Sequence, residues 1–186
     1  EETGIKLRAM AHGDFSSINE AISYASSAAA RGEPAPSRSN PYYVVVRKGL
    51  YEEDLNLTSF VHIIGDDIPQ FGVESGHEIL TNNVLVRTVN ASGTGAHRYN
   101  PQGLASVEEC HLFGLSLIGQ ANTDQPVLDQ QGGLLKLSHC LVLQSGDAVN
   151  QGEAIRCAAS NAAYAPQLWL EDSLVISEAT TADRVA

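Results

Sequence analysis

The chain has 186 residues, and its 11 Lys and Arg against 22 Asp and Glu give a formal net charge of −11. This acidic balance excludes a basic surface for nucleic acid, because phosphate binding depends on clustered Lys and Arg. No apolar run approaches the roughly 18 residues that a membrane span requires, so we expect no membrane segment. The length predicts a single domain over residues 1–186, and 43% hydrophobic content is enough for a core.

A single helix is predicted over residues 15–31. Its apolar residues recur at the i, i+3, i+4 spacing of one buried stripe, formed by Ile18, Ala21, Ile22, Ala25 and Ala29. Ser17 and Glu20 match the capping box that begins many helices. Gly32 ends the helix, and the Pro- and Ser-rich segment 31–41 predicts an exposed loop. Residues 1–41 are therefore expected to cap the N-terminal end of the domain.

From residue 42 onward the pattern changes to short β-branched runs separated by Gly, Asn, Asp and Pro. The predicted strands are 42–47, 54–57, 60–65, 84–89, 112–119, 134–143 and 168–177. The fold class is therefore all-β apart from the N-terminal helix.

Two of these runs share an L-x-x-x-L-V-[LI] frame, LSHCLVL at 137–143 and LEDSLVI at 170–176, with a displacement of 33 from Leu137 to Leu170. Leu115-Ser-Leu117 repeats the inner half of the frame, with a displacement of 26 from Leu115 to Leu141. A weak repeat of variable period predicts a solenoid. Parallel β-coils need about 20 residues a turn, so residues 42–186 would hold roughly five coils. The frame leucines, including Leu141 and Leu174, are expected to point inside.

Three segments carry a family resemblance: HGDFSSINEAI (12–22), YYVVVRKGLYEEDLNL (42–57) and VHIIGDD (61–67). Their order and spacing resemble the opening of pectin-methylesterase-like and pectate-lyase-like proteins. The resemblance covers about the first third of the chain. It implies a single-stranded right-handed parallel β-helix with an N-terminal capping helix, and it places Gly49, Tyr51 and Gly65 at coil corners.

The catalytic segments of that esterase family are missing. Asp129-Gln130 and Asp147-Ala148 are the nearest counterparts of its catalytic carboxylates, and both lack the flanking apolar strand residues. RKGLYEEDLNLTSFVHIIGDD (47–67) is similar instead to β-helices in phage and large-virus structural proteins, where the motif specifies coil geometry and no chemistry.

Other candidate sites have ordinary structural explanations. Asp66-Asp67 fits a solvated turn, and isolated acids such as Glu153 and Glu171-Asp172 fit the surface. The six histidines show no H-x-H or H-E-x-x-H spacing. Cys110, Cys140 and Cys157 form no CxxC pair and are expected to be reduced and buried. We therefore expect no catalytic residue, no metal and no cofactor.

The last predicted strand points to an interface. Alternation places Trp169 opposite Leu168 and Leu170, and therefore outward if the leucines are core. The residues after 177 carry few apolar side chains for a lid, so we expect another chain to cover Trp169, Leu174 and Ile176.

Together these features favour a non-enzymatic virion protein, a capsid decoration or a tail-fibre or spike component. Its partners would be other virion chains and copies of itself, a homotrimer being favoured, with neither nucleic acid nor membrane. The alternative is a secreted carbohydrate-active or carbohydrate-binding β-helix that resembles pectate lyases, in which Trp169 would stack on a glycan.

Overall fold

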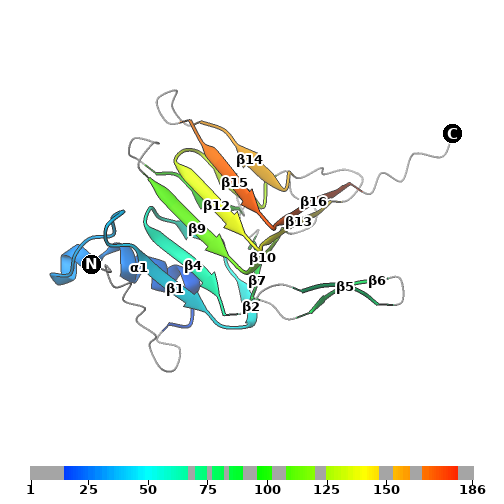
Figure 1. Ribbon diagram of the computed structural model, residues 1–186, viewed down its shortest axis with the longest axis horizontal. Coiled ribbons are helices and arrows are strands. Elements are labelled where there is room, and N and C mark those ends of the chain that lie inside the picture. The colour runs from blue at the N-terminus through cyan, green and yellow to red at the C-terminus, as the bar shows by residue number, and fades with distance from the viewer. Residues whose placement is uncertain are drawn as a thin grey trace.

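In the computed structural model, the described strands form three parallel sheets and one antiparallel hairpin (Figure 1). The structure describes residues 15–66, 70–74, 77–81, 84–89, 96–101, 108–119, 125–146, 153–159 and 165–179.

The first sheet contains β1 (Tyr42–Val46), β4 (Val61–Gly65), β9 (Glu109–Phe113), β12 (Leu134–Ser138) and β15 (Gln167–Glu171), in that spatial order. The second sheet runs from β2 (Gly49–Glu52) through β7 (Val84–Arg87), β10 (Leu115–Ile118) and β13 (Leu141–Gly146) to β16 (Leu174–Ala179). The third sheet contains β3 (Asn56–Leu57), β8 (His97–Tyr99), β11 (Leu128–Gln130) and β14 (Ile155–Cys157).

The chain visits the three sheets in a fixed cyclic order. β1, β2 and β3 make the first circuit, β4, β7 and β8 the second, β9, β10 and β11 the third, and β12, β13 and β14 the fourth. β15 and β16 begin a fifth circuit. Within each of the three sheets, strands of successive circuits pair in parallel, and the first and last strands have one neighbour each. This arrangement is compatible with a parallel β-helix.

The hairpin of β5 (Gln70–Glu74) and β6 (His77–Thr81) interrupts the second circuit between β4 and β7. It projects away from the sheets at the level of β2 and β7 (Figure 1). No strand is predicted there from the sequence, because neither segment has the run of β-branched residues seen in the others.

The predicted helix is shorter than expected and changes its period. α1 spans Ile18–Ser26, and a 3₁₀ helix, η1, follows at Ala28–Arg31. Ser17 is the N-cap, and its hydroxyl accepts a hydrogen bond from the Glu20 backbone N–H at 3.3 Å, as predicted. The tighter 3₁₀ turn buries Ala28 and leaves Ala29 exposed, so the prediction of Ala29 as a buried position is wrong.

α1 packs against β1, β3 and β4 at the N-terminal end of the stack. The Glu53 carboxylate fixes it there, accepting hydrogen bonds from the Ser17 hydroxyl at 2.7 Å and from the backbone N–H groups of Ile18 at 2.8 Å and Asn19 at 3.0 Å. A carboxylate in this position satisfies the free N–H groups of the first turn and complements the helix dipole. Glu53 lies between β2 and β3 of the first circuit, so its hydrogen bonds join the helix to the sheets.

Three predicted strands are each two strands separated by a corner. The runs 112–119, 134–143 and 168–177 bend at Gly114, His139 and Asp172, where φ is +67°, +51° and +46°. A left-handed residue turns the chain from the first sheet into the second. The sequence pattern concealed the last two corners because strand-like apolar residues continue on both sides of His139 and Asp172. His and Asp nevertheless enter this region more readily than β-branched residues do.

The register confirms the displacement of 33, since Leu137 pairs with Leu170 and Leu141 with Leu174. The displacement of 26 is wrong. Leu141 pairs with Ser116, which sets the true offset at 25. A shift of one residue exchanges the two faces of a strand, so the error also misplaced the side chains.

The interior is filled by aliphatic residues from all three sheets, among them Ile63, Leu112, Leu137 and Val142. Leu141 is buried but does not belong to this interior cluster. Its neighbour Val142 does, and successive strand residues point to opposite faces. The expectation that Leu141 and Leu174 point inside is therefore wrong, and both lie on the outer side of the second sheet.

The resemblance places Tyr51 at a corner, but it lies within β2. Its hydroxyl donates to the Arg47 carbonyl at 2.9 Å and so closes the turn from β1. Gly49 begins β2 and Gly65 ends β4. A Cβ on Gly65 would overlap the Gly114 carbonyl oxygen, because the two chain segments meet there with no room for a side chain.

Candidate functional site

The predicted carboxylates do not form a cluster in the part of the chain that the structure describes. Asp66 is exposed after β4, and Asp129 on β11 accepts a hydrogen bond from the Gln131 side-chain amide at 2.7 Å. Buried Val127 and Leu128 precede Asp129, so the expectation that it lacks flanking apolar strand residues is wrong. Glu153 is paired with Arg156 at 2.7 Å. Asp67 and Asp147 lie outside the described residues.

No group of three or more His, Cys, Asp or Glu side chains within the described ranges is arranged to hold a metal ion. Cys110 and Cys140 are buried, whereas Cys157 is exposed, which corrects the prediction for this third thiol. Likewise, none of the described helices is long and apolar enough to cross a membrane.

The outer side of the first sheet carries a column of aromatic and basic side chains. The strand register aligns Tyr43, His62, His111, Lys136 and Trp169, one from each circuit. The Tyr43 and His62 rings lie 5.2 Å apart between centroids, and His62 and His111 lie 6.2 Å apart. At the far end, Lys136 Nζ lies 5.7 Å from the centre of the Trp169 ring.

Two members of this column, His111 and Lys136, form a hydrogen-bonded group with Ser138 and Glu171. His111 Nε2 is 3.0 Å from Ser138 Oγ, Ser138 donates to Glu171 Oε2 at 3.1 Å, and Lys136 Nζ binds the same oxygen at 2.7 Å. Hydrogen bonds from Lys136 and Ser138 lower the pKa of Glu171, and burial together with Lys136 lowers the pKa of His111.

This group is not built as a serine nucleophile. An ionised carboxylate only accepts hydrogen bonds, so the Ser138 hydroxyl donates a hydrogen bond to Glu171 and accepts one from His111. A nucleophilic serine would instead donate its hydrogen bond to the imidazole, which acts as the base. The Ser138 residue is also 3% exposed, which denies a substrate access to its oxygen. The group therefore ties β9, β12 and β15 together.

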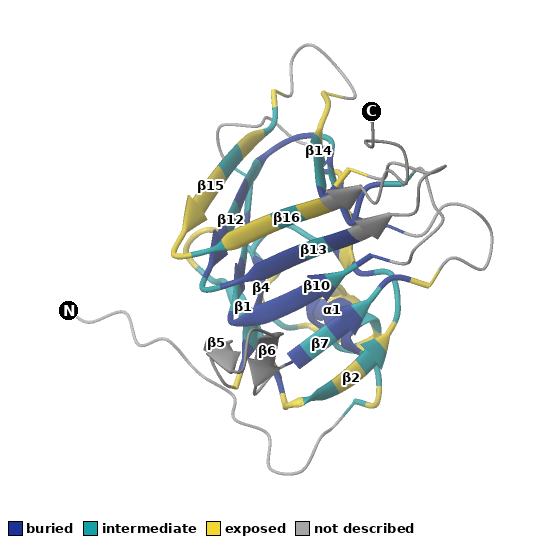
Figure 2. Cartoon of the chain, turned by 90° about the vertical axis from the view of Figure 1, so that its right-hand side faces the viewer, coloured by how far each residue is buried: buried dark blue, intermediate teal, exposed yellow. Residues whose placement is uncertain are grey.

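The fifth circuit exposes side chains whose counterparts are buried in the fourth. Leu170 is 46% and Leu174 is 42% exposed, whereas their register partners Leu137 and Leu141 are 0% and 1% exposed. Trp169 is 60% exposed, and Figure 2 shows the exposed colour over β15 and β16. The sequence prediction that Trp169 points outward agrees with this position. Ile176 is half-buried.

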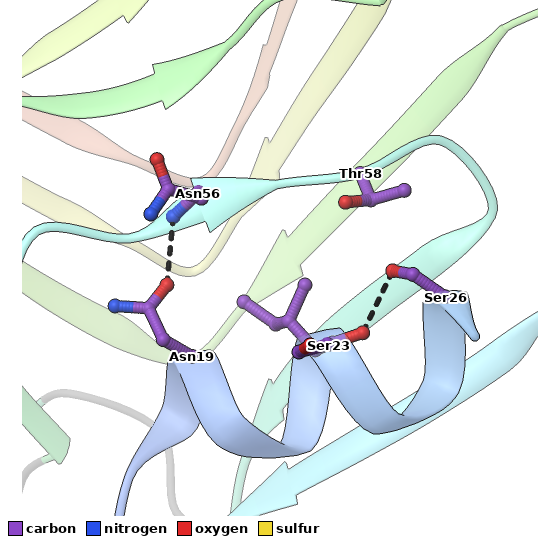
Figure 3. Close-up of a pocket in the computed structure, with 6 residues that line it drawn as sticks. Asn19, Ser23, Ser26, Asn56 and Thr58 are labelled. Atoms are coloured by element: carbon purple, nitrogen blue, oxygen red, sulfur yellow. Dashed lines mark hydrogen bonds between the residues drawn. The ribbon is translucent and has the colours of Figure 1, made fainter.

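A pocket lies between α1 and β3 (Figure 3). It is lined by Asn19, Ile22, Ser23, Ser26, Asn56 and Thr58. The Asn19 side chain accepts from the Asn56 N–H and donates to the Asp54 carbonyl, both at 2.8 Å, and Ser26 donates to the Ile22 carbonyl at 2.7 Å. The Asn19 bonds attach the helix to the β3 segment, whereas the Ser26 bond lies within α1.

Sequence reasoning missed the column of aromatic and basic side chains, including the contact between its two histidines. His62 and His111 are 49 residues apart and share no motif, and only the register of β4 against β9 brings them together. Comparison of the chain with family models, with curated proteins and with solved structures gives no match.

Proposed function

We propose that the chain is a non-enzymatic structural protein of a virion, a capsid decoration or a tail-fibre or spike component. In this proposal it folds as a single right-handed parallel β-helix. Crossovers between parallel strands of one sheet are right-handed in about 98% of cases, and the cyclic visits to three sheets consist of such crossovers.

The observation that carries the proposal is the contrast between the two ends of the stack. At the N-terminal end, α1 buries Ile18, Ile22 and Ala25 against the first circuit. At the other end, Trp169, Leu170 and Leu174 are exposed on strands that have no partner on one side within the described sheets. Apolar side chains on an open strand edge favour pairing with another chain.

The surface chemistry supports a structural role over a catalytic one. The hydrogen-bonded group of His111, Lys136, Ser138 and Glu171 is internally paired. Ser138 is buried and donates its hydrogen bond to the Glu171 carboxylate. The net charge of −11 keeps such a chain soluble until an apolar contact brings it to a specific partner. We propose a homotrimer or a lattice of virion chains in which Trp169, Leu174 and Ile176 are buried.

Sedimentation velocity tests this assembly. The wild-type chain is expected at about three times its 19.8 kDa mass, and Trp169→Ser is expected to sediment as a monomer because it removes the aromatic anchor of the contact. Leu50→Ser is the matched control. It removes an equally exposed apolar side chain from β2, at the capped end, and should stay oligomeric. A monomeric wild-type protein, or an oligomer unaffected by Trp169→Ser, would contradict the proposal.

The exposed Trp169 ring also favours a second candidate, carbohydrate binding. Lys136 lies beside the ring and is paired with Glu171, and both side chains would offer hydrogen bonds to sugar hydroxyls. Titration calorimetry with polygalacturonate separates the two functions. Saturable heat that Trp169→Ser abolishes would favour glycan binding, and absence of heat with an intact oligomer would favour the virion role.

A further inference from the structure

Two histidines accept hydrogen bonds from the main chain of a neighbouring circuit. His97 on β8 is fully buried, and its Nδ1 accepts the backbone N–H of Leu55 at 3.0 Å. Leu55 immediately precedes β3 in the first circuit, so the bond joins the first circuit to the second. The other ring nitrogen, Nε2, carries the proton and makes no hydrogen bond of good geometry.

His62 repeats the arrangement one circuit further along. Its Nδ1 accepts the backbone N–H of His111 at 3.0 Å, which joins β4 of the second circuit to β9 of the third. The ring is buried between Tyr43 and His111. In both cases a neutral imidazole supplies an acceptor to the N–H of a neighbouring circuit.

A protonated imidazole carries N–H on both nitrogens and has no acceptor left. Protonation of His62 or His97 would therefore place two donors against each other and remove the bond to the neighbouring circuit. We propose that His62 and His97 form an acid-sensitive latch that holds the first three circuits together at neutral pH and releases them on acidification. This inference is independent of the virion role.

Burial of the two imidazole rings opposes their protonation, because no nearby negative charge in the described part of the chain stabilises the protonated form. Burial lowers the pKa of His97 to about 4, and the Val86 backbone offsets only part of that effect. Burial also lowers the pKa of His62. Among the residues that the structure describes, the titratable groups in ring contact with His62 are Tyr43 on β1 and His111 on β9.

His111 in turn faces a mixture of charges. Lys136 and His62 lower its pKa, whereas Glu171 and Glu109 raise it. For His62 itself, burial is the cause of the lowered pKa, and no charged group among the described side chains offsets it. Among the described side chains, no charged group contributes to the shift of His97.

The sign of the pH dependence follows from linkage. An unfolded histidine titrates near pH 6.5 and the folded His97 near pH 4, so the unfolded chain binds the extra proton between these values. Stability is therefore complete above pH 6.5 and falls as the pH drops towards 4. For His97 alone, the folding equilibrium constant should decrease roughly 20-fold between pH 7 and pH 5. His62 adds to this loss.

Urea denaturation of the full chain at pH 7 and pH 5 tests the latch. Wild-type protein should lose stability at pH 5 by at least that factor. His97→Gln keeps an oxygen acceptor for the Leu55 N–H but does not titrate, so the roughly 20-fold part of the loss that His97 contributes should disappear. Leu50→Ser, which changes an exposed apolar side chain and no titratable group, is the control and should keep the wild-type pH dependence.

Hydrogen exchange on wild-type protein decides the matter if His97→Gln does not fold. After correction for intrinsic rates, the amides of Leu55 and His111 should lose more protection between pH 7 and pH 5 than the amide of Leu134. Leu134 is the reference because its acceptor is the Glu108 carbonyl, at 2.8 Å, which does not titrate. Equal changes at the three amides, or full pH dependence in folded His97→Gln, would overturn the proposal.

Discussion

Removal of the Glu53 carboxylate should detach the capping helix from the first circuit. Glu53 accepts three hydrogen bonds, from the Ser17 hydroxyl and from the N–H groups of Ile18 and Asn19. Loss of an N-cap acceptor typically costs about 1 kcal/mol, and the lost favourable interaction with the helix dipole adds up to about 1 kcal/mol. Loss of the hydrogen bond from the Ser17 hydroxyl costs about 1 kcal/mol more. Glu53→Ala should therefore lower the free energy of unfolding by about 3 kcal/mol.

Glu52→Ala is the matched control for this measurement. Glu52 is adjacent in the chain, is exposed and pairs with Arg87 at 3.4 Å, so its removal should cost under about 0.5 kcal/mol. Urea denaturation gives both values, and hydrogen exchange at Ile18 and Asn19 should accelerate only in Glu53→Ala. If both variants unfold at the same urea concentration as wild type, Glu53 does not hold the helix.

Three further predictions concern the interior. Leu137→Ala should lower the free energy of unfolding by about 3 kcal/mol in urea titrations, because a fully buried leucine leaves a cavity; a loss under 1 kcal/mol would place Leu137 outside the core. Gly65→Ala should express as insoluble or strongly destabilised protein, since its Cβ would overlap the Gly114 carbonyl; a melting temperature like that of wild type would argue against this close approach. A thiol reagent at pH 8 should label Cys157 and spare the other two cysteines, because burial raises their pKa values to about 12 and about 11; rapid labelling of all three in native protein would contradict their burial.

The positions of most strands could be predicted because β-branched runs persist through the chain. The 33-residue frame even gave the correct pairing of Leu137 with Leu170. The corners could not be located, since His139 and Asp172 adopt positive φ without the glycine that usually announces such a turn. The shift of one residue at Leu115 has another cause. Leu115 follows its corner residue Gly114 directly, whereas Cys140 separates the corner residue His139 from Leu141.

The outward position of Trp169 follows from alternation within one strand, which is a local property. The imidazole contacts depend instead on register between circuits. His97 reaches Leu55 across 42 residues of sequence, and His62 reaches His111 across 49. These separations follow from loop lengths and from the inserted β5–β6 hairpin, which no periodicity encodes. For that reason the candidate latch emerged only from the folded chain.

The assembly claim is tested most directly by the fluorescence of Trp169, because it is the only tryptophan in the sequence. Its ring is 60% exposed in the single chain and should be buried once another chain covers the fifth circuit. We predict that acrylamide quenches the emission weakly in concentrated protein and increasingly on dilution, as the oligomer dissociates. Strong quenching, equal to that of a free indole at every concentration, would show that Trp169 stays in solvent and would contradict the proposed interface.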